Sequence, residues 1–203
     1  SDLAMYAASL RIDNYSIPGL RIGLSGYYGH AIGNSYPRNA NGVDEEYKGE
    51  VAIGSIDFTY KAHNWIVRGQ ADYGYLGDAE QLKYVYNRLN SKSPYKHSAF
   101  VSKNAYAVGI EAGYDIFSQI PQMREDDQQL YVFGRYEQYN PYASQTKGVD
   151  YGYTEVKRLA VGVNYHPVPQ IVIKAEYSKR LLKSIYNDEP SINIGVAYEG
   201  FFL

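Results

Sequence analysis

The chain has 203 residues and a formal net charge of −2, which allows one large domain or two small ones and argues against binding to nucleic acid. It contains no cysteine, so a disulfide framework and a thiolate metal site are both excluded. The chain has 24 tyrosines, far more than an ordinary soluble domain. It contains no apolar stretch of about 20 residues, the length that a membrane helix needs.

Apolar side chains recur at every second position along most of the chain, which is the pattern of a β-strand with two unlike faces. The pattern predicts about nine strands. In chain order they are Leu3–Asp13, Gly19–Gly29, Val51–Ala62, Trp65–Leu76, Ala105–Phe117, Leu130–Tyr139, Val156–Tyr165, Gln170–Ser178 and Ser191–Phe202. Because the pattern is uniform, it predicts a single domain over residues 1–203.

One face of each predicted strand carries no charge, and the other carries most of the charged side chains. In a soluble sandwich the charged face meets bulk water, whereas in an outer-membrane barrel the apolar face meets lipid and the charged face lines a polar lumen. The predicted pore-lining residues are Arg11, Asp13, Arg21, Asp57, Lys61, Arg68, Asp72, Glu111, Asp115, Arg135, Glu137, Arg158, Lys174 and Glu176.

Strand length and aromatic placement favour the barrel. Soluble strands have about 5 or 6 residues, whereas a tilted membrane strand needs about 9 to 11, which is the length of most of these runs. Tyrosines gather toward the ends of the apolar faces, where a ring with a polar tip suits the lipid headgroup boundary. They are Tyr28, Tyr60, Tyr73, Tyr75, Tyr114, Tyr136, Tyr165, Tyr177 and Tyr198.

The predicted connections alternate between short and long. Asn14–Pro18, His63–Asn64 and His166–Pro169 are short, whereas His30–Glu50 and Gly77–Asn104 are long. Outer-membrane barrels show this asymmetry, with short periplasmic turns and longer extracellular loops. A closed single-chain barrel with both ends in the periplasm has an even number of strands, so we expect a further upstream strand or a second chain to complete the ring.

Three stretches of the sequence carry a resemblance to a known family. They are IPGLRIGLSGYYG (Ile17–Gly29), LYVFGRYEQYN (Leu130–Asn140) and LAVGVNYHPVPQIVIKAEY (Leu159–Tyr177). These phrases resemble, in the same order, the closing hairpins of the phosphate-selective porin O/P family. The resemblance implies a trimeric barrel of about sixteen strands that passes small anions or other solutes, with this chain as its C-terminal half. It also implies inward positions for Arg135, Glu137, Lys174 and Glu176.

The charged face does not by itself predict selectivity for phosphate. Basic and acidic side chains are equally frequent on it, whereas an anion filter needs an excess of fixed positive charge or of donors where the pore narrows. The end of the chain also departs from the family's terminal aromatic residue, because Leu203 follows Phe202.

No catalytic or metal-binding motif is evident, so we predict neither an enzyme nor a cofactor. The stretch around Ser25 lacks the final glycine of a nucleophile elbow and lies within a predicted strand. Asp57 and Asp72 are inward carboxylates, and we expect Arg68 and Lys61 to compensate their charge. The histidines fall in different predicted connections, without the short spacing of a metal site. They are His30, His63, His97 and His166.

The longest connection, Gly77–Asn104, is rich in cations and begins with a helical stripe after Asp78. Its cations and those of the last predicted loop suit the phosphates of lipopolysaccharide, with solvated loops as the alternative. The residues are Lys83, Arg88, Lys92, Lys96, Lys103, Lys179, Arg180 and Lys183.

The sequence therefore predicts an outer-membrane porin, a passive diffusion channel for small solutes that include anions, embedded in lipid and lipopolysaccharide. Its expected partners are copies of itself in a trimer or other outer-membrane proteins. One alternative is a structural or docking barrel within a larger outer-membrane complex. A more distant alternative is a soluble carbohydrate-binding β-sandwich that uses tyrosines as stacking platforms.

Overall fold

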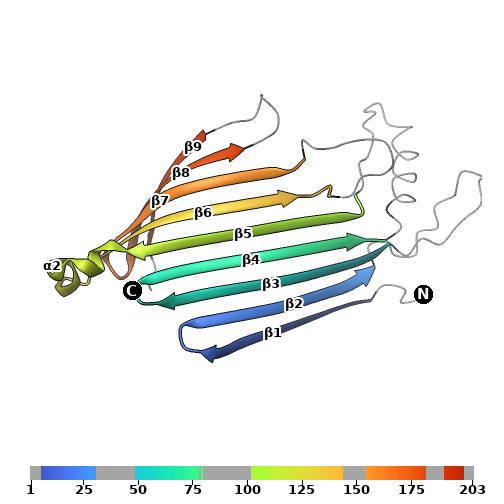
Figure 1. Ribbon diagram of the computed structural model, residues 1–203, viewed down its shortest axis with the longest axis horizontal. Coiled ribbons are helices and arrows are strands. Elements are labelled where there is room, and N and C mark those ends of the chain that lie inside the picture. The colour runs from blue at the N-terminus through green and yellow to red at the C-terminus, as the bar shows by residue number, and fades with distance from the viewer. Residues whose placement is uncertain are drawn as a thin grey trace, which may run out of the picture.

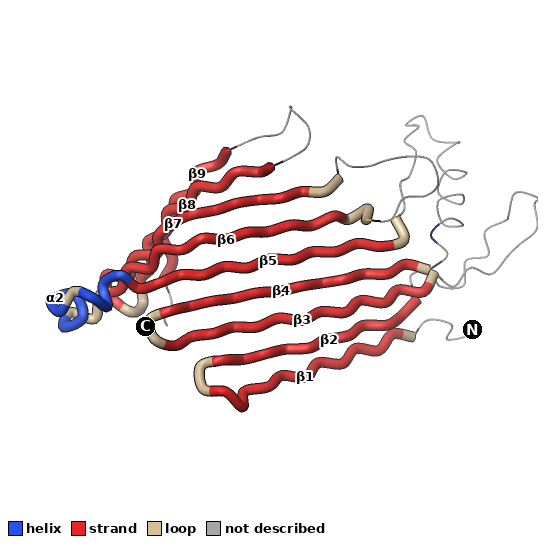
Figure 2. Tube along the Cα trace, in the orientation of Figure 1, coloured by secondary structure: helices blue, strands red, loops and turns tan. Residues whose placement is uncertain are grey.

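A computed structural model of the chain describes residues 6–30, 49–77, 79, 102–143, 154–181 and 190–198. Its strands pair in chain order to form one nine-stranded antiparallel sheet (Figures 1 and 2), which confirms the all-β prediction. They are β1 (Ala7–Ile17), β2 (Leu20–His30), β3 (Glu50–Ala62), β4 (Trp65–Leu76), β5 (Asn104–Asp115), β6 (Gln129–Asn140), β7 (Val156–Val168), β8 (Ile171–Leu181) and β9 (Pro190–Tyr198). β1 and β9 form the two edges of this sheet.

The first hairpin is tighter than predicted. β1 continues to Ile17, because a bulge between Asn14 and Ile17 absorbs the break in alternation and leaves a turn at Pro18 and Gly19. The Asn14 side chain accepts a hydrogen bond from the Ser16 backbone N–H at 3.1 Å, which stabilises the bulge. The predicted start of this strand, Leu3, lies outside the described residues.

The second hairpin turns where predicted, and only the start of β3 differs, at Glu50 instead of Val51. His63 and Asn64 form its turn with φ angles of 53° and 64°. Two successive positive φ values belong to the turn whose twist matches that of a two-stranded ribbon, and asparagine tolerates this conformation well. β3 and β4 therefore pair without a register shift, from Ala62 opposite Trp65 outward.

The connection from β5 to β6 is helical. The strand predicted to reach Phe117 ends at Asp115, where a short 3₁₀ helix, η1 (Ile116–Gln119), begins, followed by α2 (Pro121–Glu125). Asp115 ends the strand because its carboxylate accepts the Phe117 N–H at 3.1 Å, and this bond caps η1. A proline then suits the first turn of α2, since its missing N–H has no helical partner there.

The hairpin from β7 to β8 also differs from its prediction. Pro167 lies in a bulge at the end of β7, where the lack of an N–H costs no ladder bond, and the turn is at Pro169 and Gln170. β8 extends to Leu181, so the prediction that Lys179 and Arg180 lie in a loop is wrong.

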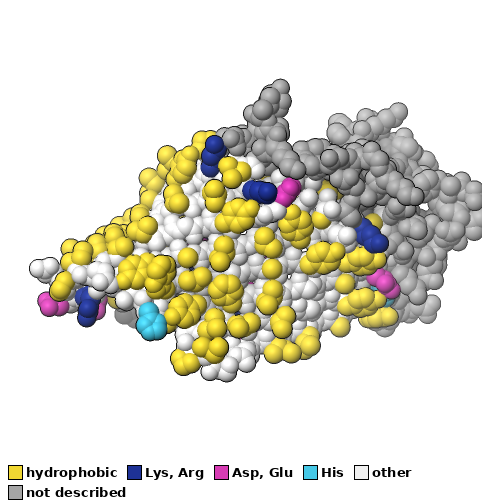
Figure 3. Space-filling view, viewed as in Figure 1, with side chains coloured by type: hydrophobic (Ala, Val, Ile, Leu, Met, Phe, Trp, Pro, Cys, Tyr) yellow, Lys and Arg dark blue, Asp and Glu magenta, His cyan; other side chains and the backbone are white. Residues whose placement is uncertain are grey.

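The apolar face of the sheet is uncovered. In the described part of the chain, Ala79 and Ala160 are the only buried hydrophobic residues, whereas Leu10, Val161 and Ile194 are 67%, 58% and 79% exposed. Figure 3 shows hydrophobic side chains spread across this face, with few charged ones among them. A sandwich would cover this face with a second sheet. The described strands form a single layer instead, so the sandwich alternative is wrong.

Aromatic residues border the apolar face at both strand ends. At the end with the two-residue turns, the rings of Trp65 and Tyr114 lie 4.9 Å apart on neighbouring strands. Toward the other end, Tyr73 faces Tyr106 across the β4–β5 pair, and the Lys103 ammonium lies 5.5 Å from the Tyr75 ring. This placement is typical of the aromatic girdles that flank the lipid-facing band of a membrane barrel.

Candidate functional site

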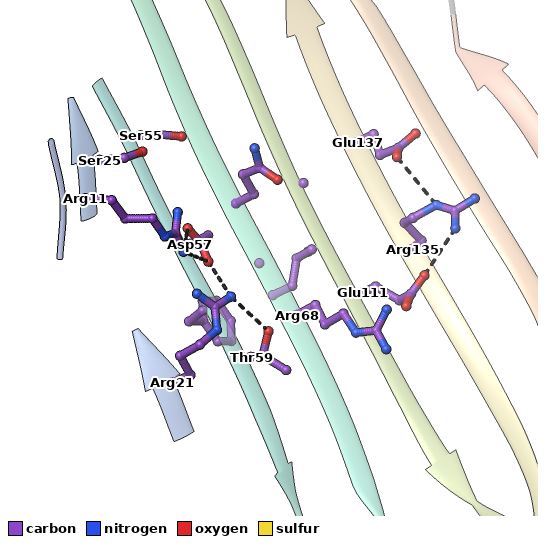
Figure 4. A pocket seen from close by; sticks show the side chains of 15 residues that line it. Arg11, Arg21, Ser25, Ser55, Asp57, Thr59, Arg68, Glu111, Arg135 and Glu137 are labelled. Atoms are coloured by element: carbon purple, nitrogen blue, oxygen red, sulfur yellow. Dashed lines mark hydrogen bonds and ion pairs between the residues drawn. The ribbon is translucent and has the colours of Figure 1, made fainter. Parts of the chain in front are cut away.

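The register of the sheet joins polar and charged side chains from neighbouring strands into cross-strand rows on the charged face. Because side chains alternate between faces, residues directly opposite each other point to the same side. One row contains, in order from β2 to β6, Arg21, Thr59, Arg68, Glu111 and Arg135. Figure 4 shows these side chains projecting from neighbouring strands. They line one recess with a volume of about 680 Å³.

The first charge cluster pairs two arginines with two aspartates on β1, β2 and β3. Asp13 Oδ1 lies 2.8 Å from a guanidinium nitrogen of both Arg11 and Arg21. Asp57 lies 3.1 Å from Arg11 and 2.5 Å from Arg21. Each aspartate thus bridges two arginines, and the cluster carries no net charge.

Gly23 makes room for this first cluster. It lies between the paired strands, opposite Asp13 on one side and Asp57 on the other. A Cβ atom at Gly23 would lie 2.5 Å from Arg11 Nη2 and 2.8 Å from Asp57 Oδ2. The charged groups of the first cluster therefore occupy the space that the side chain of any larger residue at position 23 would need.

The second charge cluster gathers three glutamates around Arg135. The guanidinium group lies 2.7 Å from Glu176, 3.1 Å from Glu111 and 3.5 Å from Glu137. These carboxylates come from β8, β5 and β6, so the cluster links strands far apart in sequence. With one arginine against three glutamates, the cluster has a formal charge of −2.

The remaining predicted cations on the charged face have no acidic partner. Among the described residues, no carboxylate lies within the 4.0 Å of an ion pair from any of them. Figure 4 shows the Arg68 guanidinium between the two clusters, with no ion pair drawn to either. These unpaired cations are Lys61, Arg68, Arg158 and Lys174.

Arg180 joins this unpaired group, and sequence reasoning missed it. The register places Arg180 opposite Arg158, so both side chains belong to the charged face, near the end away from the two-residue turns. No acidic partner of Arg180 occurs in the described part of the chain. The alternation of Lys174, Glu176, Ser178 and Arg180 could have placed Arg180 on the charged face. The predicted strand ends at Ser178, however, which places Arg180 in the following loop.

Asp72 and Asp115 are not compensated by cations. Asp72 accepts hydrogen bonds from Ser55 and from Gln70, the latter at 2.7 Å, so the expected compensation of Asp57 and Asp72 by Arg68 and Lys61 is wrong. Asp115 is only 5% exposed. Its Oδ1 accepts backbone N–H groups of η1 and of β6, so Asp115 shapes the connection rather than lining a pore.

The other predicted sites are separated in space or lie outside the described residues. Lys179 belongs to the apolar face opposite Leu159. Ser25 lies opposite Ser55, with no histidine beside it in the register. His30 and His166 lie in strands and His63 in a turn. The predicted residues outside the described parts are Lys83, Arg88, Lys92, Lys96, His97 and Lys183.

Within the described ranges, no three histidine or carboxylate side chains lie close enough to hold a metal ion. The helices of the described residues are too short and too polar to cross a membrane.

Comparisons with known proteins bear on the fold. No protein-family model matches the chain. A protein of Aquifex aeolicus (strain VF5), described as uncharacterized, is 28% identical over 136 residues, which are 66% of this chain and 30% of that protein. A solved structure of OmpTdeltaL8, a loop L8 deletion mutant of OmpT, an outer membrane protein of Vibrio cholerae, is similar with a TM-score of 0.52 and 13% sequence identity.

The match to OmpTdeltaL8 covers 96% of this chain and 53% of that one. This chain therefore spans about half the length of OmpTdeltaL8, and its match to the Aquifex protein spans about a third of that protein. The nine antiparallel strands thus have the fold of an outer-membrane β-barrel wall.

Proposed function

We propose that the chain forms part of an outer-membrane porin that passes small solutes by diffusion and favours anions. The supporting observation is the state of the charges on the charged face. The carboxylates there are bound by arginines or by neutral donors, whereas Lys61, Arg68, Arg158, Lys174 and Arg180 have no acidic partner among the described residues.

The cationic side chains that remain unpaired in the described part of the chain, rather than the total charge of this face, favour anions. Cations and anions on this face nearly balance, so its long-range field is weak. At contact distance, however, a passing anion meets ammonium and guanidinium groups that have no acidic partner among the described residues, whereas a passing cation meets carboxylates already bound by arginine or by neutral donors. The opposed Arg158 and Arg180 are a second supporting feature, since like charges directly opposite each other destabilise a sheet unless something neutralises them.

The proposed assembly is a larger closed barrel, of about sixteen strands, that forms trimers in the outer membrane. Its support is the resemblance to phosphate-selective porins, the unpaired outer edges of β1 and β9 in the described sheet, and a match that spans half of OmpTdeltaL8. Contact of the outward Lys179 with lipopolysaccharide phosphate belongs to the same proposal.

Planar-bilayer recording of the full-length protein tests the proposal. We expect open-channel conductance and, under a KCl gradient, a reversal potential on the side of chloride. Arg68→Gln should shift this potential toward potassium, because it removes a cation between the two clusters that has no acidic partner in the described part of the chain. Lys157→Gln is the control: it removes the same charge from the apolar face of β7, where Lys157 lies 3.8 Å from Glu155, and it should leave the reversal potential unchanged.

Two results would count against this function. A folded, inserted protein without conductance would favour the structural or docking barrel instead. A reversal potential equally shifted by Arg68→Gln and Lys157→Gln would show that free cations on the charged face do not set selectivity.

A further inference from the structure

The connection between β5 and β6 is unlike the others at its end of the sheet. β1–β2, β3–β4 and β7–β8 close with two-residue turns, whereas residues Ile116–Gln128, here called the rim segment, form η1, α2 and a short link. Figures 1 and 2 show α2 projecting beyond the strand ends, at the end opposite the N-terminus. Short turns mark the periplasmic end of an outer-membrane barrel, so the rim segment lies beside the inner, phospholipid leaflet.

The rim segment continues the apolar face of the sheet. Ile116, the first residue of η1, lies two positions after Tyr114 and so continues the apolar alternation of β5; it is 40% exposed, and Ile120 is 38% exposed. The Phe117 ring packs edge-on against Tyr165 of β7 at a centroid distance of 6.0 Å. Its apolar residues are therefore contiguous with the aromatic belt, as Figure 3 shows for this end of the molecule.

Hydrogen bonds fasten the rim segment to the same belt. Gln119 Nε2 donates to the Tyr114 hydroxyl at 2.5 Å, and the Tyr165 hydroxyl donates to Gln128 Oε1 at 2.7 Å. Tyrosine hydroxyls in such a belt ordinarily reach lipid headgroups. Here the rim segment occupies them, so it takes the position of the headgroups over two tyrosines.

The charged residues of the rim segment lie at its other end. Arg124, Glu125, Asp126 and Asp127 follow one another at the end of α2, and all are exposed. Apolar residues against the wall and charged residues away from it make an amphipathic segment of the kind that lies in the membrane interface plane.

We propose that the rim segment is an interfacial anchor, with Ile116, Phe117 and Ile120 at the headgroup and acyl boundary of the phospholipid leaflet and α2's charged end in water. The anchor rests on the outer-membrane placement of the proposed function, but not on channel activity. The anchor fixes how deeply this end of the barrel sits in the membrane. The other hairpins at the same end of the described sheet close with two-residue turns and have no such segment.

Fluorescence quenching in phospholipid vesicles tests the anchor, because Trp65 is the only tryptophan of the chain and lies in the adjacent belt. In a Trp65→Phe background, Ile120→Trp places the only indole on the proposed lipid side, and Glu125→Trp is the matched control on the wet side. Brominated phospholipid should quench the indole at position 120 to within roughly twofold of Trp65, and aqueous iodide should quench it weakly. The indole at position 125 should behave in the opposite way.

Each outcome has a separate meaning. If iodide quenches positions 120 and 125 equally and brominated lipid quenches neither, the anchor is wrong. If brominated lipid also fails to quench Trp65 in the unsubstituted protein, the membrane placement itself is wrong. Heat-dependent migration in electrophoresis would verify that both variants are folded before quenching is compared.

Discussion

Arg135→Gln should destabilise the protein by about 1–3 kcal/mol, because one guanidinium group compensates three carboxylates. The magnitude follows from the contacts to Glu111, Glu137 and Glu176, at 3.1, 3.5 and 2.7 Å. Exposed ion pairs contribute about 0.2–1 kcal/mol each, whereas removing one partner of a fully buried pair costs about 3–5 kcal/mol. The side chains of this cluster are 20% to 37% exposed, so each ion pair should contribute a free energy nearer to that of an exposed pair. The loss of three such pairs together gives the expected destabilisation of about 1–3 kcal/mol.

Urea unfolding of the reconstituted protein, followed by Trp65 emission, measures this effect. Arg158→Gln is the matched control, since it removes the same charge from the charged face without breaking an ion pair, and it should change stability by less than about 0.5 kcal/mol. Adding Glu176→Gln to Arg135→Gln should recover part of the loss, because it removes one of the uncompensated carboxylates. Equal unfolding midpoints for Arg135→Gln and Arg158→Gln would refute the reasoning.

Two further substitutions test local packing by the same unfolding assay. Gly23→Ala should cost about 1 kcal/mol by pushing Arg11 out of the first cluster, whereas Gly26→Ala, where a Cβ meets nothing within 4 Å, should be neutral; equal effects would contradict the crowding at Gly23. Asp115→Ala should cost about 2 kcal/mol, because two backbone N–H groups lose their acceptor, and Asp115→Asn should restore most of the loss; an equally unstable Asp115→Asn would show that the charge, not the hydrogen bonds, matters.

Most strand positions follow from alternation, and the departures occur where a local structure interrupts it. Tyr15 and Ser16 lie in a bulge, so the strand extends beyond the point at which the apolar pattern fails. Ile116 continues the apolar alternation of β5 but belongs, together with Phe117, to a 3₁₀ helix, because the Asp115 side chain caps the chain there. Arg180 looked like part of a loop, although its pairing with Arg158 keeps it in the sheet.

The sequence by itself determined which face of each strand is apolar and which is charged, because side chains alternate strictly along a strand and this period is a local property. It also determined the aromatic belts, since they depend only on where each apolar run ends. Only the tertiary structure decided which charges meet. Arg11 and Asp57 are 46 residues apart and Arg135 and Glu176 are 41 apart, so their pairing depends on the register of several strands. That register sorts nearly equal numbers of basic and acidic side chains into two ion-pair clusters and a set of cations without an acidic partner among the residues that the structure describes.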